Sequence, residues 1–194
     1  RGAMLVENRV AGRIIGTLVG PMGGASIFEQ RSCMSDKLNA QVAAPGFSLI
    51  DAPHLARGMG SGLHDGDGRP THHRTLVDQG MLTQWLINVY YSRKLDRKPT
   101  SGGTSNLIVP PGSRTPAEIL SDLDWAIKVD GFLGGNSNPA TGRYSFGIRG
   151  TLYEKGEPTA AVSEMNITGS IFDLMGSFLE AADDPWLYGS SRSP

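Results

Sequence analysis

The chain has 194 residues, enough for one domain with a hydrophobic core or for two subdomains. Its 18 basic and 19 acidic side chains leave a net charge of −1 with no basic run, which argues against nucleic acid as a direct ligand. Cys33 is the single cysteine, so an internal disulfide and a zinc site built mainly from thiolates are excluded, and we expect a cytoplasmic protein.

Glycine is abundant, with 26 residues in the chain. Many glycines imply many turns, bulges and close backbone contacts, which suit a β-rich or mixed fold better than a helical bundle. We therefore predict an α+β fold in which mainly antiparallel sheets are joined by a few packed helices.

The first predicted elements are a strand over 3–6 and a helix over 10–24, with Asn8 as its cap. Pro21 lacks an N–H and crowds the preceding turn, so regular helix should stop or kink near Gly20. The helix should be buried, because its apolar residues recur on one face: Ile14, Ile15, Leu18, Val19 and Met22.

A second face of this helix carries only glycine, at positions 12, 16, 20 and 24. Glycine in a helix interior costs about 1 kcal/mol relative to alanine, so we expect another backbone to pack closely against this face. The spacing would also suit a membrane helix. However, the apolar run is about half of the roughly 20 residues needed and Arg13 interrupts it, so no membrane partner is expected.

A strand over 47–51 precedes a long loop over 52–70. Its glycines lack the lysine of a phosphate-binding loop, and Leu76 stands where a calcium loop needs glutamate. His64, His72 and His73 could gather around a metal with nearby aspartates, although adjacent residues of a strand point to opposite faces. The simpler alternative is that these histidines lie on the surface.

The other elements are predicted from the periodicity of apolar residues and from residues that favour turns. Thr115, Pro116 and Glu118 form the signature of a helix start, and the apolar stripe of that helix extends to Ile127. We further predict strands over 71–77, 81–91, 105–109, 143–153 and 160–167, helical turns near 90–95 and over 171–179, a loop over 134–142 and an irregular tail over 183–194.

Two long glycine loops, 58–68 and 134–142, are the candidate peptide-binding or interface segments, because long ordered loops often carry function. Their polar side chains are Asp65, Asp67, Asn136 and Asn138. The alternative is that these side chains bond their own backbone in turns, as Asp and Asn commonly do.

Several stretches resemble, in order and spacing, the C-terminal domain of the TldD/PmbA family, whose PmbA subunit is also called TldE and whose members have long been labelled modulators of DNA gyrase. They are VAGRIIGTLVGPMGGASIFEQRSCMSDKLNAQV, HDGDGRPTHHRTLVDQGMLTQWLINVYYSRKL, SNLIVPPG, GGNSNPATGRYSFGIRGTLYEKGE, VSEMNITGSIFDLM and DDPWLYGSSRSP. The resemblance implies a single C-terminal domain over 1–194, with the family's N-terminal half and last strand outside this sequence.

The resemblance also implies a two-subunit peptidase. A TldD-type subunit binds zinc through HExxxH on a helix and a later cysteine, with the glutamate as base, and a TldE-type partner lacks these residues. In this chain the two histidine positions are Gly16 and Pro21 and the glutamate position is Thr17, while residues 181–193 contain no cysteine. The resemblance therefore implies no catalytic residue and no cofactor in this chain, and zinc in a TldD-like partner.

The leading hypothesis is a non-catalytic subunit that docks on a TldD-like partner, or on a second copy, and helps to hold an extended peptide. Strands can bind such a peptide by adding it to a sheet edge. Two alternatives stay open. The chain could be a stand-alone peptide- or protein-binding module, or a hydrolase with a relocated metal site at residues 64–73.

Overall fold

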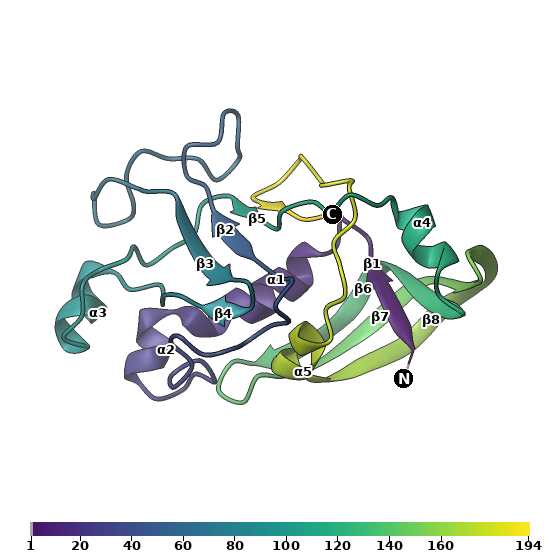
Figure 1. Ribbon diagram of the computed structural model, residues 1–194. Coiled ribbons are helices and arrows are strands. Elements are labelled where there is room, and N and C mark those ends of the chain that lie inside the picture. Colours follow the sequence, from purple (N-terminus) through teal and green to yellow (C-terminus); the bar gives the residue numbers. More distant parts are fainter. Residues whose placement is uncertain (1) are drawn as a thin grey trace.

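The computed structural model describes residues 2–194, which form two sheets joined by short helices (Figure 1). The four-stranded sheet has the order β1-β6-β7-β8, with β1 parallel to β6 and the other pairs antiparallel. Its strands are Ala3–Val6, Trp125–Asn138, Arg143–Glu154 and Glu157–Ser170.

The five-stranded sheet has the order β4-β3-β2-β5-β9. Its strands are Met81–Leu82, Arg74–Asp78, Leu49–Asp51, Leu107–Ile108 and Ser191–Arg192. Only β5 and β9 are parallel in this sheet. The predicted α+β class with mainly antiparallel sheets is confirmed.

Helix α1, Gly12–Val19, contacts both sheets. Its apolar face lies in the main core with residues of β2 and β3, where Leu18, Leu49 and Leu76 are fully buried. On its other side Arg13 donates from Nη2 to the Gly135 carbonyl of β6, at 2.9 Å, and lies 4.6 Å from the ring centre of Phe146 on β7. Helix α1 thus occupies the centre of the fold (Figure 1).

Regular helix ends at Val19 and tightens into the 3₁₀ turn η1, Gly20–Met22, as Pro21 predicts. The prediction that Asn8 caps α1 is wrong. Ala11 is the cap residue, and Asn8 instead donates from Nδ2 to the Asp184 carbonyl at 2.7 Å.

Four short helices complete the structure: α2 Gly24–Phe28, α3 Val89–Lys94, α4 Pro116–Ser121 and α5 Ile171–Gly176. The capping box at Thr115 is present. The expected continuation of that helix to Ile127 is wrong, because Trp125 already begins β6, and backbone pairing with β1 and β7 decides the conformation there.

The predicted loop over 134–142 is wrong for its first five residues and correct for the last four. Strand β6 continues to Asn138, with Gly134 and Gly135 directly after a β-bulge, and residues 139–142 form the turn to β7. The strand predicted over 81–91 is also too long. β4 ends at Leu82, and the apolar residues that follow enter the core as extended chain, with Leu86 donating its N–H to the Met22 carbonyl at 2.8 Å.

The tail is more ordered than expected, since Ser191–Arg192 form β9. Among residues 2–194, no helix combines the length and the apolar character that crossing a membrane requires.

Candidate functional site

The glycine face of α1 is only partly covered. A Cβ on Gly12 would lie 3.4 Å from the Cβ of Ser191, and one on Gly24, at the start of α2, 3.3 Å from the Leu86 carbonyl oxygen. A Cβ on Gly16 or Gly20 would meet no atom within 4 Å. The expectation of a closely packed backbone therefore holds at Gly24 alone. At Gly12 the neighbour is a side chain, and at Gly16 and Gly20 the face is open.

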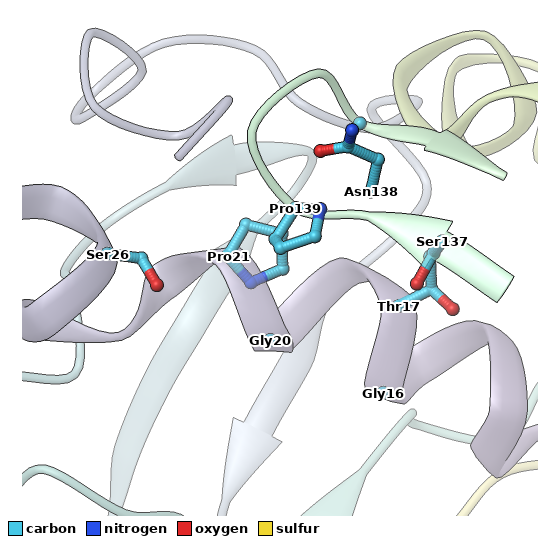
Figure 2. A pocket seen from close by; sticks show the side chains of 9 residues that line it. Gly16, Thr17, Gly20, Pro21, Ser26, Ser137, Asn138 and Pro139 are labelled. Atoms are coloured by element: carbon cyan, nitrogen blue, oxygen red, sulfur yellow. The ribbon is translucent and has the colours of Figure 1, made fainter. Parts of the chain in front are cut away.

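Gly16 and Gly20 form one wall of a cavity of about 190 Å³, and the end of β6 with the following turn forms the other (Figure 2). Figure 2 shows Ser137, Asn138 and Pro139 on the strand end and turn that face Thr17 and Pro21, with the Asn138 amide pointing away from the helix. The lining residues are all uncharged: Gly16, Thr17, Gly20, Pro21, Ser26, Ser137, Asn138, Pro139 and Gly142.

Backbone hydrogen bonds fix the turn that forms the second wall. Cys33 donates its N–H to the Pro139 carbonyl at 2.8 Å, and Gly142 donates to the Asn138 carbonyl at 2.8 Å. Arg13 ties β6 to α1 just before the turn. Two backbone hydrogen bonds and one side-chain hydrogen bond thus fix the position of this wall relative to α1.

The cavity does not suit a zinc ion. The three positions that the sequence resemblance assigns to HExxxH, Gly16, Thr17 and Pro21, all lie on its wall and offer no imidazole or carboxylate. The Thr17 hydroxyl is turned back onto the helix and donates to the Arg13 carbonyl at 2.9 Å. Among residues 2–194, no three His, Cys, Asp or Glu side chains are grouped so that they could hold a metal, and this includes the region 64–73.

Of the predicted site residues, Asn138 lines this cavity and Asn136 does not. The Oδ1 atom of Asn138 accepts the N–H of Ala140 at 2.9 Å, a bond within its own turn. Asn136 is exposed on β6, opposite Ser145. Their role in binding stays a prediction.

Asp65 lines a different cavity, of about 440 Å³, between the loop 52–70 and residues 99–105. Burial alone would raise the pKa of Asp65. Hydrogen bonds from the N–H of Arg69, the Ser101 hydroxyl and the N–H of Asp67, with the charge of Arg69, outweigh burial and lower the pKa.

Asp67 ties the loop to α3, because its Oδ2 accepts the N–H of Val89 at 2.8 Å. The two predicted glycine segments thus contribute to two separate cavities that share no lining residue.

Sequence reasoning missed the buried pair at the second cavity, Asp51 and Arg74, whose side chains are 4% and 11% exposed. The one signal in the sequence for this pair is that Asp51, a charged residue, ends an apolar strand. The open face at Gly16 and Gly20 was also missed, because the spacing of glycines does not reveal whether their face is covered.

Comparison with known proteins agrees with this architecture. A sequence profile described as the PmbA/TldA metallopeptidase C-terminal domain matches residues 1–194. Metalloprotease PmbA of Escherichia coli O157:H7 is 30% identical over 186 residues, 95% of this chain and 41% of that protein. A PmbA homolog of Haemophilus influenzae is 33% identical over 182 residues, 91% of this chain and 40% of that protein. The chain thus spans about two fifths of these relatives.

Solved structures share the fold. A protein of Bacteroides thetaiotaomicron described as a modulator of DNA gyrase has a TM-score of 0.96 at 33% identity, covering 100% of this chain and 44% of that one. TldE from Thermococcus kodakarensis has a TM-score of 0.86 at 19% identity, covering 100% and 46%, and shows the likeness of fold alone. The profile match and the PmbA relatives establish that this chain belongs to the PmbA/TldD metallopeptidase family, as its C-terminal domain.

Proposed function

We propose that this chain belongs to a metal-free, non-catalytic subunit of a TldD/TldE-type peptidase. Its task is to dock on a TldD-like partner and to hold part of an extended peptide while the zinc of the partner cleaves it. One observation carries the proposal: the family's zinc-binding positions line an open, uncharged cavity and bear no side chain that can bind the metal.

The cavity suits peptide backbone. A helix without side chains at Gly16 and Gly20 lets another chain approach α1 closely, and the hydroxyls of Ser26 and Ser137 can bond amide groups without requiring charge. Such contacts do not depend on the sequence of the peptide.

A free edge for strand addition supports the same proposal. Strand β8 has 14 residues and lies at the edge of the four-stranded sheet, where no strand of residues 2–194 pairs with its outer side. Its N–H and C=O groups could pair with an extended peptide or with a strand of the partner.

Filling the cavity tests the proposal. Gly20→Phe places a ring in open space, so the fold should persist, whereas cleavage of an unfolded peptide by the mixture with a HExxxH-bearing partner should fall at least about tenfold. Gly176→Phe is the matched control, since Gly176 is equally open and does not line the cavity. Unchanged cleavage with Gly20→Phe would reject the cavity as the binding site.

A further inference from the structure

The cavity of about 440 Å³ is lined by charged side chains, unlike the cavity beside α1. It is lined from β2 by Asp51, from the 52–70 loop by His64, Asp65 and Arg69, and from β3 and its approach by His72 and Arg74. In Figure 1 the loop between β2 and β3 projects from the top of the molecule. This cavity shares no residue with the one beside α1.

The buried pair at its base is fully engaged within the protein. Arg74 lies 2.8 Å from Asp51, and its remaining N–H groups donate to the carbonyls of Thr100, Ser101 and Gly103. The other carboxylate oxygen of Asp51 accepts from the N–H and the hydroxyl of Ser105. Neither side chain has spare capacity for a ligand.

Asp65 is engaged in the same way. Its Oδ1 accepts the N–H groups of Asp67 and Arg69 at 3.0 and 2.9 Å, and its Oδ2 accepts the Ser101 hydroxyl at 2.8 Å. Internal donors therefore occupy three of the four acceptor positions of the Asp65 carboxylate and all four of the Asp51 carboxylate.

Of the basic groups, Arg74 is fully engaged, whereas Arg69, His64 and His72 are not. Arg69 donates one hydrogen bond, from Nη1 to the Pro99 carbonyl at 3.2 Å, and forms no ion pair within 4 Å among residues 2–194. His64 and His72 are exposed, and in the same range their rings make no hydrogen bond. The groups that remain available to a ligand are therefore the unused N–H donors of the Arg69 guanidinium and the two exposed imidazoles.

We propose that this cavity binds a carboxylate, supplied by the C-terminus of a peptide or by an acidic side chain, with Arg69 as the principal contact and His64 and His72 beside it. A guanidinium binds a carboxylate through two parallel N–H groups, which suits the free side of Arg69. Gly66 and Gly103 in the lining leave room for the rest of the ligand, because a Cβ at either position would meet no atom within 4 Å. The site is independent of the function proposed for the α1 cavity.

Calorimetric titration of the 194-residue chain tests the proposal with three probes: N-acetyl-trialanine with a free carboxylate, its C-terminal amide, and an amidated acetyl tripeptide with a central glutamate. We expect the first, the third or both to bind and the neutral amide not to bind. Binding of the first alone identifies a peptide terminus as the ligand, and binding of the third alone identifies an acidic side chain.

Variants then locate the site. Arg69→Gln should weaken binding at least about tenfold, and Arg69→Lys should retain part of the affinity. Arg93→Gln, which removes an exposed arginine of α3 outside the cavity, should have no effect. Absence of binding of all three probes at millimolar concentration, equal binding of the neutral amide, or equal losses with Arg69→Gln and Arg93→Gln would overturn the proposal.

Discussion

Gly16 and Gly20 occupy helical or 3₁₀ backbone, yet no atom of residues 2–194 lies near enough to forbid a side chain. Alanine at either position should therefore stabilise the fold by about 1 kcal/mol, because it removes the entropic cost of helical glycine. Urea denaturation measures this free energy.

Gly24→Ala is the matched control, since its Cβ would lie 3.1 Å from that of Tyr91 and 3.3 Å from the Leu86 carbonyl oxygen. It should stabilise less or destabilise. Destabilisation by Gly16→Ala and Gly20→Ala would mean that the glycines are needed by the fold and not by an occupant of the cavity.

Asp65 provides a second prediction at this scale. Its pKa is lowered in the folded chain, mainly by hydrogen bonds that outweigh burial, so its ionised form stabilises the fold above the unfolded value near pH 4. That contribution is lost as pH falls through the folded pKa. Asp65→Asn should therefore lower the free energy of unfolding at pH 7 and have a smaller effect at about pH 3.

Asp78→Asn, which removes an exposed carboxylate at the end of β3, is the control for denaturation curves between these two pH values. If Asp65→Asn lowered the free energy of unfolding by the same amount at pH 3 and at pH 7, this account of the carboxylate would be contradicted.

At the scale of elements, the pair of Asp51 and Arg74 joins β2 to β3 and to the segment at residues 100–103. Asp51→Ala leaves a buried guanidinium without its counter-ion and should cost about 3–5 kcal/mol of folding free energy. Asp122→Ala breaks the pair of Asp122 with Arg114, whose side chains are 69% and 35% exposed, and should cost less than about 1 kcal/mol. If thermal or urea unfolding showed similar losses of folding free energy for Asp51→Ala and Asp122→Ala, the structural role of the buried pair would be contradicted.

Elements with strong local signals could be predicted from the sequence. The capping box at Thr115, the stop at Pro21 and the strand over 143–153 are all present, because each is decided by nearby residues. Local signals failed for β6, where residues 125–127 continue a helical stripe but pair with β1 and β7. Long-range pairing decided that conformation.

The site was predictable only in part. Asn138 and Asp65 line cavities, but Asn136 and Asp67 line neither of the two. The cavity beside α1 depends on contacts between residues more than 100 positions apart, such as Cys33 with Pro139 and Arg13 with Gly135. Sequence periodicity carries no information about such contacts.

At the scale of the whole molecule, a domain of a metallopeptidase family has an open, uncharged cavity beside α1, lined by the three positions that the sequence resemblance assigns to HExxxH. Under the proposed function, this chain contributes shape and a TldD-like partner contributes the metal. We therefore expect cleavage only when a zinc-carrying partner is present.

The most direct test measures zinc content and peptidase activity of the full-length protein alone, and then mixed with a HExxxH-bearing partner from the same cell. We expect no stoichiometric zinc and no cleavage from the protein alone, and cleavage in the mixture. Stoichiometric metal together with cleavage by the protein alone would contradict the account.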